Sequence, residues 1–329
     1  MYIPPIAARL AATRGAMRAV LFESYGSADV LAVRDIPKPE PGRRQVRVKV
    51  RAAALNPKDS FVRSGRFRAF TGSSFPKLLG YDFAGTVEAV GPGVPAEWEG
   101  TEVLGMLNGF AGGSAAEFVV ASLDEVAKKP AGLSFEEAAA VPLVSLTALQ
   151  ALRDDGAVTS GSRVLIHGAS GGVGVHAIQI ARALGAQVTT TSSARNREHC
   201  RHLGAHETLD YEVDGGLSVD GRWDCVFDVF GNLSFAKVRA SLAMRGTYVT
   251  TVPGPRVLVD RAMSLLSRKR ARVVIVRSTR IDLDIVARFI ATHQLRPIVD
   301  RMFPLAEAAA AQRHIETKRA RGKVVLRVA

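Results

Sequence analysis

The chain has 329 residues, of which 47% are hydrophobic and 23% charged, with a formal net charge of +13. This length predicts two domains, each able to bury its own core. No apolar run approaches the roughly 18 residues that cross a bilayer, which argues against an integral membrane protein. Two cysteines, Cys200 and Cys225, are too few for a disulfide framework or a four-thiolate zinc site, and they suit a reducing, cytoplasmic compartment.

The basic residues gather in two runs, at 268–272 and 318–323. Such runs attract nucleic acid, anionic lipid or a phosphorylated ligand. No aromatic side chains interleave them, so they offer no stacking platform for single strands. A solvated surface is the first interpretation, help in attracting a phosphorylated cofactor the second, and nucleic-acid binding the least favoured.

The first 16 residues contain Arg9 and Arg14 and no acid, but they lack the serines and the length of a transit peptide. We expect them to be an extension that precedes the first strand. The next ~120 residues alternate short apolar-polar stretches with turns, which predicts mostly strands. The expected strands are 17–22, 46–50, 85–90 and 117–120.

From Arg163 the pattern changes to alternating strands and helices, which predicts a parallel α/β sheet. Between the first two strands, Val173, Ala177, Ile180 and Leu184 recur at helical spacing and predict one apolar helix face. Gly185 follows as an expected C-terminal cap. The expected strands are 164–166, 187–191, 207–209, 225–229 and 247–252.

The last ~60 residues predict a strand at 272–276, a helix at 282–292, a helix at 306–317 and a strand at 324–328. No internal repeat or low-complexity tract occurs.

A glycine-rich turn, His-Gly-Ala-Ser-Gly-Gly-Val-Gly at 167–174, follows the strand 164–166 and opens the amphipathic helix. Glycines permit a tight turn and close approach of the backbone to a pyrophosphate, and the helix N-terminus supplies N–H groups and a favourable dipole. Strand, turn, helix and second strand occur in the order that a dinucleotide site requires. We therefore predict dinucleotide binding.

The choice of dinucleotide depends on the end of the second strand, where an NAD site usually places Asp or Glu. Here the sequence is Thr-Ser-Ser-Ala-Arg-Asn-Arg at 191–197, with no acid until Glu198. Hydroxyls and guanidinium groups suit a 2′-phosphate, so NADPH is the predicted cofactor. The alternative is a helix N-cap at Ser192 or Ser193 followed by solvated arginines.

Several motifs together resemble the medium-chain dehydrogenase/reductase superfamily, in its zinc-free quinone oxidoreductase-like branch, over nearly all of 17–329. The Ser-Ala-Arg-Asn stretch further resembles alkenal/one oxidoreductases and their chloroplast-envelope and mitochondrial relatives. The motifs are Ala-Leu-Asn-Pro-Lys-Asp at 54–59, Gly-Tyr-Asp-Phe-Ala-Gly at 80–85, the glycine-rich turn, Leu-Gly-Ala at 203–205 with Asp-Tyr at 210–211, and Gly-Lys-Val-Val-Leu at 322–326.

The resemblance implies an α/β protein with a GroES-like, mostly-β domain and a Rossmann domain built on a doubly wound parallel sheet. The GroES-like domain would be discontinuous, at 17–140 and 272–329, around a Rossmann NADP-binding domain at 141–271. The active site would lie in the cleft between them. In such proteins the strand near 272–276 often pairs with its equivalent in a second subunit, so we expect a homodimer.

The cofactor-binding residues expected on this basis extend from the glycine-rich turn to the ends of the neighbouring strands. We expect Ser192, Arg195 and Tyr211 to surround the 2′-phosphate, with Arg197 or Lys323 as the alternative base. The full set is Thr147, Ser170, Gly171, Gly172, Val173, Gly174, Ser192, Arg195, Tyr211, Phe230, Val252 and Lys323.

Zinc-dependent relatives have a cysteine at the position of Asn56 and a histidine at that of Tyr81, so the resemblance implies no metal here. Asn56 and Tyr81 are the expected catalytic residues, positioning the nicotinamide or the acceptor carbonyl, with Tyr81 a candidate proton donor. The alternatives are a turn residue before Pro57 for Asn56, and plain packing for Tyr81. Asp82 is expected to order the local backbone.

Without a metal, reduction of an electron-poor acceptor is the expected chemistry, since NADPH carries the hydride and the protein supplies orientation. The predicted function is reduction of a quinone or an α,β-unsaturated carbonyl. An enoyl-thioester reductase is the enzymatic alternative. A basic nucleic-acid-binding protein or a non-catalytic cofactor-binding protein of the same fold are alternatives of another class.

Overall fold

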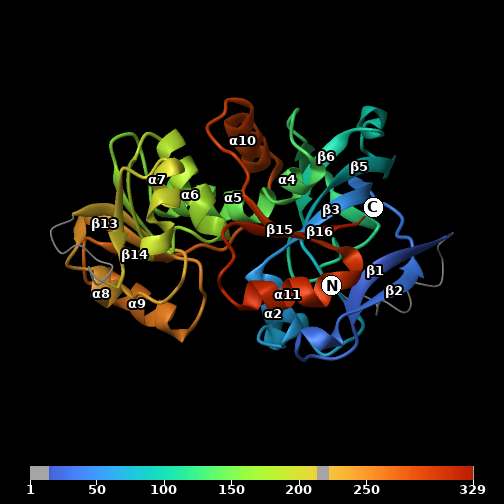
Figure 1. The fold of residues 1–329 in the computed structure, drawn as a ribbon, viewed down its shortest axis with the longest axis horizontal. Coiled ribbons are helices and arrows are strands. Elements are labelled where there is room, and N and C mark those ends of the chain that lie inside the picture. The colour runs from blue at the N-terminus through green and yellow to red at the C-terminus, as the bar shows by residue number, and fades with distance from the viewer. Residues whose placement is uncertain (1–14, 213–221, 329) are drawn as a thin grey trace. The chain divides into compact units, whose positions relative to one another are not determined.

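Figure 1 shows the protein as a computed structural model, which describes residues 15–212 and 222–328. The expected N-terminal extension therefore lies outside the described residues, apart from Gly15 and Ala16. Ala16 already belongs to the first strand, β1 (Ala16–Phe22), one residue before the expected start.

The chain divides into two compact units. Unit 1 comprises 1–143, 278–287 and 297–329, and unit 2 comprises 144–277 and 288–296. The sequence placed the boundaries at 140/141 and 271/272, a few residues earlier, and did not assign 288–296 to the second unit. Unit 1 is thus assembled from both ends of the chain.

In the described part of unit 1, three strands form a sheet in the order β2-β1-β4, and a larger seven-stranded sheet has the order β15-β16-β3-β5-β6-β8, with β7 also paired to β3. The strands are β2 (Ala32–Pro37), β3 (Gln45–Leu55), β4 (Lys77–Leu78), β5 (Asp82–Val90), β6 (Glu102–Met106), β7 (Phe118–Ser122), β8 (Val126–Lys128), β15 (Val299–Pro304) and β16 (Lys323–Arg327).

The long strand β3 organises unit 1. Val46, Val48 and Val50 alternate with charged residues and are fully buried, as the period-2 pattern predicted. The run of alanines that follows is buried too, because small side chains fit where the strand is covered on both faces. β3 pairs antiparallel with β5, Ala54 opposite Asp82, and with β16, Leu55 opposite Val324. The end of β3 therefore meets the starts of β5 and β16.

Unit 2 contains a parallel sheet whose described strands have the order β11-β10-β9-β12-β13-β14. This doubly wound order confirms the expected Rossmann architecture. The strands are β9 (Arg163–His167), β10 (Gln187–Ser192), β11 (Glu207–Asp210), β12 (Trp223–Asp228), β13 (Leu242–Thr250) and β14 (Arg270–Val273).

Strand β14 corrects one assignment. The strand predicted at 272–276 was expected in the GroES-like domain, but β14 pairs with β13 at the edge of the parallel sheet of unit 2, with Tyr248 opposite Ala271. Its neighbours explain the difference: Ala271 and Val274 are buried, Ala271 in the core cluster that contains Trp223 and Phe235. The strand completes that core.

The helices connect and cover these sheets (Figure 1). They are α2 (Pro57–Arg63), α3 (Arg68–Thr71), α4 (Phe135–Ala139), α5 (Pro142–Leu149), α6 (Gly172–Ala183), α7 (Arg197–His202), α8 (Phe235–Val238), α9 (Pro255–Leu265), α10 (Arg280–Ala291) and α11 (Ala308–Glu316), with a π-helical turn at Gln150–Asp155 and short 3-10 turns at 28–30, 96–98, 123–125, 194–196 and 305–307. In the part of the chain described here, no helix combines the length and apolarity needed to cross a membrane.

Helix α6 buries more of its residues than the single apolar face predicted from the sequence. Ala177 and Ile180 are buried as expected, but every residue from Gly174 to Ala181 is buried as well, Gln179 included. The Gln179 side-chain oxygen accepts a hydrogen bond from the backbone N–H of Arg296 at 2.8 Å, which satisfies this polar group inside unit 2. Gly185 has a φ of +81°, as a glycine at a helix C-terminal cap does.

Candidate functional site

The glycine-rich turn of unit 2 connects β9 to α6. Gly168 has a φ of +82°, and a Cβ atom at Gly174 would lie 2.5 Å from the backbone oxygen of Ala169. Only glycine therefore lets α6 start this close to the turn. At Gly171, by contrast, there is space for a side chain, because a Cβ there would lie at least 3.8 Å from any atom outside the adjacent residues.

The open space over Gly171 lies at the N-terminus of α6, where no side chain caps the helix. Ser170, Gly171, Gly172 and Val173 are half-buried, so part of their surface stays accessible. Free N–H groups and the helix dipole suit an anionic group at this position. These residues fit the pyrophosphate of a dinucleotide.

At the end of β10 the structure brings together most of the residues expected at the 2′-phosphate. The backbone N–H of Tyr211 donates to the Ser192 carbonyl at 3.4 Å, and the Tyr211 side chain is 46% exposed. Arg195 is exposed. Ser192 needs a correction, because its side chain is buried and its hydroxyl donates to the Ser193 carbonyl at 3.3 Å. Ser193, half-buried before the 3-10 turn 194–196, is the serine with accessible surface.

Two neighbouring residues have structural partners that the sequence did not reveal. Arg197, an alternative base for the 2′-phosphate, donates to the Thr208 carbonyl at 3.0 Å and to its hydroxyl at 3.3 Å, so it ties α7 to β11. Asn196 donates to the Ser170 hydroxyl at 3.0 Å and joins this segment to the glycine-rich turn. No spacing rule pointed to Asn196.

Phe230 lies beside the glycine-rich turn, and Val252 lies beside Gly231, the residue that follows Phe230. A Cβ atom at Gly168 would lie 3.3 Å from the Cβ of Phe230, and one at Gly231 would lie 2.3 Å from a methyl group of Val252. The Phe230 ring is 51% exposed. Thr147 lies on α5 and is buried, so its expected contact with the cofactor remains a prediction.

Hydrogen bonds to the Asp228 side chain fix the loop that contains Phe230. Its carboxylate accepts hydrogen bonds from the backbone N–H groups of Gly231 at 2.7 Å and Leu233 at 2.9 Å, and from the Tyr248 hydroxyl at 3.0 Å. A fully buried carboxylate with three donors fixes the loop in one conformation.

In unit 1, Asn56, Asp82 and Lys323 form a buried polar cluster where β3, β5 and β16 meet. The Lys323 ammonium donates to the Leu55 carbonyl at 3.0 Å, to Asp82 at 3.1 Å and to the Asn56 side-chain oxygen. The Asn56 amide donates to Asp82 at 2.9 Å, and the second Asp82 oxygen accepts the backbone N–H of Leu143 at 2.8 Å.

The cluster changes the roles expected for two residues. Asn56 is 1% exposed, and both its amide nitrogen and its amide oxygen are hydrogen-bonded within the cluster. It therefore connects β3 to β5 and β16, and its side chain is not available to bind an acceptor. Lys323 is 3% exposed with its ammonium hydrogens directed at three oxygens, which leaves it unsuited to a 2′-phosphate. Asp82 orders the backbone at Leu143, as predicted.

Asp59 supports the cluster from the first turn of α2. Its carboxylate accepts the backbone N–H of Asn56 at 2.7 Å and that of Gly80 at 2.9 Å. Burial raises the pKa of Asp59 to about 6. Asp59 belongs to the motif at 54–59 but had no predicted role, although an acid three positions after Asn56 is the spacing of a capping box.

Tyr81 does not offer a free hydroxyl. The side chain is 1% exposed, its hydroxyl donates to the Phe110 carbonyl at 3.1 Å, and burial raises its pKa far above the ordinary value. The Lys58 ammonium lies 3.7 Å from the centre of the Tyr81 ring and donates to the Gly109 carbonyl at 2.6 Å. Burial lowers the pKa of Lys58. The expected proton-donor role of Tyr81 is therefore replaced by support of the 109–110 loop.

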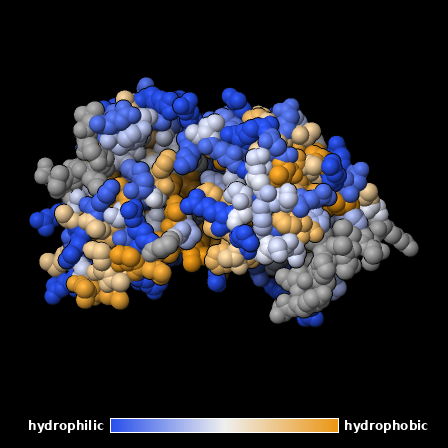
Figure 2. Space-filling model, turned by 90° about the horizontal axis from the view of Figure 1, so that it is seen from below, coloured by the Kyte–Doolittle hydropathy of each residue, from blue (hydrophilic) through white to orange (hydrophobic). Residues whose placement is uncertain are grey.

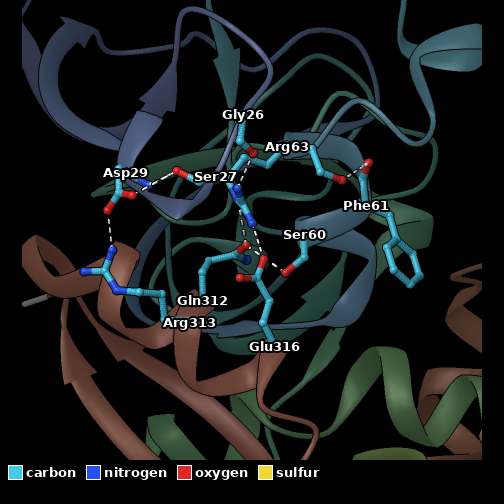
Figure 3. A network of polar contacts seen from close by, with 10 residues as sticks. Gly26, Ser27, Asp29, Ser60, Phe61, Arg63, Gln312, Arg313 and Glu316 are labelled. Atoms are coloured by element: carbon cyan, nitrogen blue, oxygen red, sulfur yellow. Dashed lines mark hydrogen bonds and ion pairs between the residues drawn. The ribbon is translucent and has the colours of Figure 1, made fainter.

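The other end of α2 is fixed by Arg63, shown in Figure 3. Arg63 is 1% exposed and donates to the Gln312 side chain at 3.1 Å, to the Gly26 carbonyl and to Glu316. Ser60 donates to the same Gln312 oxygen at 2.9 Å. The network joins α2 to α11 and so holds Asn56 and Asp59 at the opposite end of the helix.

Within residues 15–212 and 222–328, no group of three His, Cys, Asp or Glu side chains is placed to hold a metal ion. The polar cluster at Asn56 instead contains a cation of its own, Lys323, paired with Asp82.

Two family models match the chain. The alcohol dehydrogenase GroES-like domain matches residues 42–131, and the zinc-binding dehydrogenase family matches residues 203–326. The first lies in unit 1, and the second extends from unit 2 into the C-terminal part of unit 1.

Full-length relatives agree with these matches. The chain is 31% identical over 322 residues to the chloroplast envelope quinone oxidoreductase homolog of Arabidopsis thaliana, covering 94% of this chain and 98% of that protein. It is 33% identical over 328 residues to the NADPH-dependent alkenal/one oxidoreductase, chloroplastic, of the same plant, covering 94% and 79%.

Solved structures show the same fold. A quinone oxidoreductase from Coxiella burnetii superimposes with a TM-score of 0.88 at 34% identity, over 96% of this chain and all of that one. An NAD-dependent alcohol dehydrogenase gives a TM-score of 0.83 at 35% identity, covering 95% and 100%. A mycobacterial protein complexed with NADPH gives 0.78 at 29%, also covering 95% and 100%.

A GroES-like unit and a Rossmann unit with an intact glycine-rich turn define an oxidoreductase with a nicotinamide cofactor. The chain belongs to the medium-chain dehydrogenase/reductase superfamily, in its quinone oxidoreductase-like branch.

Proposed function

We propose that this protein transfers a hydride from NADPH to a quinone or an α,β-unsaturated carbonyl without a metal ion. The observation that carries the proposal is the buried Asn56–Asp82–Lys323 cluster. In zinc-dependent relatives the position of Asn56 belongs to a metal ligand. Here that position is an amide bound to a lysine–aspartate pair, so the chemistry calls for an acceptor that is reducible without a Lewis acid.

The names of the relatives support this class of acceptor. Those described above include a quinone oxidoreductase homolog and an alkenal/one oxidoreductase. Both kinds of acceptor are electron-poor conjugated carbonyls. When bound, the nicotinamide supplies a hydride, and a quinone that takes this hydride and one proton becomes a hydroquinone.

The proposal of NADPH over NADH rests on the end of β10. The accessible groups there are the guanidinium of Arg195, the hydroxyl of Ser193 and the phenol of Tyr211, and β10 ends without a carboxylate. A carboxylate at that point would select NADH by holding the ribose hydroxyl and repelling a phosphate. A relative is named NADPH-dependent and one neighbour was solved with NADPH.

The residues of unit 1 act in this proposal by positioning. Lys323 and Asp82 hold Asn56, and Asp59 holds the first turn of α2, so the segment after β3 is rigid. Asp228 fixes the loop of Phe230 beside the glycine-rich turn in the same way. Because Tyr81 is buried and its hydroxyl is engaged, water is the proposed proton source for the reduced acceptor.

The test is oxidation of NADPH and NADH by the purified chain with a panel of quinones, enals, enones and enoyl thioesters. We expect turnover with the first three classes and a lower KM for NADPH. Turnover confined to enoyl thioesters would assign the enzyme to a different acceptor, and an absence of turnover with every acceptor would refute the proposal.

We also propose that the protein is a homodimer and acts in the cytoplasm. Strand β14 lies at the edge of its sheet, followed by Ile275 with 75% of its surface exposed. Helix α9, which contacts β14, has exposed apolar side chains, with Leu258 73% and Leu265 81% exposed. Figure 2 shows apolar surface on the half of the molecule that contains unit 2. Light scattering at micromolar concentration should give twice the mass of the chain, and a monomer there would contradict the dimer.

A further inference from the structure

Four phenylalanines form an aromatic cluster in unit 1. They lie on α2, in the turn before α3, on α3 and in the loop after β6. Phe67 is its centre and meets Phe61, Phe70 and Phe110 edge to face, with ring centres 5.6 to 6.4 Å apart. Phe70 and Phe110 are stacked, 5.7 Å apart with 17° between their planes. Such pairs hold each other in fixed orientations.

Two rings of this cluster are exposed. Phe70 is 73% and Phe110 36% exposed, while Phe61 and Phe67 are half-buried. Because the rings are already packed against one another, the protein loses little conformational entropy when a ligand stacks on them. Exposed aromatic surface that is held rigid in this way suits recognition of a flat ligand.

A cation lies next to the stacked pair. The Lys58 ammonium is 5.1 Å from the centre of the Phe110 ring and 3.7 Å from that of Tyr81. It donates one hydrogen to the Gly109 carbonyl, and an ammonium has three. Beside the aromatic surface there is thus a donor for a carbonyl oxygen.

We propose that the exposed faces of Phe70 and Phe110, with Lys58 beside them, bind the flat ring of a quinone. The proposal rests on the proposed function and narrows its acceptor class. A fused-ring quinone has both a planar surface to stack and carbonyl oxygens to accept a hydrogen bond. An acyclic enal has the carbonyl but no ring, so it gains little from this surface.

The first experiment measures binding without turnover. Calorimetric titration of the cofactor-free protein with 9,10-phenanthrenequinone should give a dissociation constant about 2- to 12-fold higher in Phe70→Ala than in wild type, the range for one aromatic pair. Phe70→Leu keeps apolar bulk without a ring and should weaken binding similarly. Wild-type affinity in either variant would overturn the proposal.

The matched control is Ile281→Ala, since Ile281 is 74% exposed and also lies in unit 1. It should bind the quinone as wild type does, and equal weakening in this variant would refute a specific aromatic surface. Thermal unfolding of all three variants checks the fold, which substitution at such exposed positions leaves intact.

The second experiment separates this inference from the function on which it rests. With NADPH, Phe70→Ala should raise the KM for 9,10-phenanthrenequinone about 2- to 12-fold and leave that for the acyclic enal crotonaldehyde unchanged. If wild type turns over no acceptor, the proposed function fails. If wild type reduces quinones and Phe70→Ala does so with the same KM, only the aromatic surface is refuted.

Discussion

Replacing Lys323 by methionine is the sharpest test of the buried cluster in unit 1. The ammonium is 3% exposed and its three contacts all reach oxygen atoms. Methionine fills similar space but donates nothing, so the fully buried Asp82 loses its cation and keeps two hydrogen-bond donors, Asn56 and Leu143. Removing one partner of a buried ion pair destabilises a protein by about 3–5 kcal/mol.

Unfolding of unit 1 can be followed separately by tryptophan fluorescence, because the two tryptophans, Trp98 and Trp223, lie in different units. In a Trp223→Phe background the fluorescence comes from Trp98, which is 6% exposed and reports on unit 1. Urea unfolding should show a midpoint lowered on the order of 2 M by Lys323→Met, given a slope of about 1–3 kcal/mol per M.

The double variant Asp82→Asn/Lys323→Met is the control. It replaces the carboxyl group that has lost its cation by an amide, so we expect it to recover part of the lost stability, with a coupling of about 0.5–3 kcal/mol between the two positions. If the single and double variants unfold at the same midpoint, or if Lys323→Met costs less than about 1 kcal/mol, the ion pair does not hold the strands together.

Three further outcomes follow. Burial raises the pKa of Asp59 from 3.8 to about 6, so its contribution to stability is fully present below about pH 4 and is lost as the pH rises through 6. Over this range the wild-type protein should therefore lose up to about 3 kcal/mol of unfolding free energy relative to Asp59→Asn. Parallel pH profiles of the two proteins in urea titrations would contradict this assignment. Arg195→Ala should raise the dissociation constant for NADPH roughly 10- to 150-fold and leave that for NADH nearly unchanged, as one charged hydrogen bond implies. Ser193→Asp, at the serine with accessible surface, should turn the preference toward NADH. Equal weakening of both cofactors by Arg195→Ala would remove Arg195 from the 2′-phosphate site. Metal analysis should find zinc below stoichiometry, and a chelator should leave turnover unchanged; stoichiometric zinc needed for activity would refute the proposed mechanism.

The sequence predicted the elements whose determinants are local. The glycine-rich turn was found because glycine is required at fixed positions between a strand and a helix, and the structure shows the close approach at Gly174 that demands it. The apolar alternation located the start of β3 to within one residue, but the predicted strand 46–50 ended five residues early because the run of alanines at 52–54 does not alternate with polar residues. Strand β15 was missed because its side chains are half-buried or exposed without alternation.

The side-chain partners within the site were less predictable, because they depend on contacts between distant segments. Asn56 and Lys323 are 267 positions apart, and no spacing rule joins them. Ser192 is the last residue of β10 and Ser193 precedes the 3-10 turn 194–196, so the boundary of the strand, which a sequence pattern locates poorly, separates the two serines. The sequence named the buried serine for the 2′-phosphate, while its neighbour has the accessible surface.

Unit 1 is assembled from segments at both ends of the chain, which affects how the protein folds during synthesis. Strand β16 covers one side of β3 and supplies Lys323, yet it is made after all of unit 2. At about 5–20 residues per second, residues 144–329 take roughly 10 to 40 s to emerge. During that time residues 52–55 of β3 lack their pairing with β16, and unpaired strand edges recruit other chains. Asp82 also lacks its partner Lys323 until β16 is made. Unit 2 can therefore complete its sheet before unit 1, whose larger sheet needs the C-terminal residues.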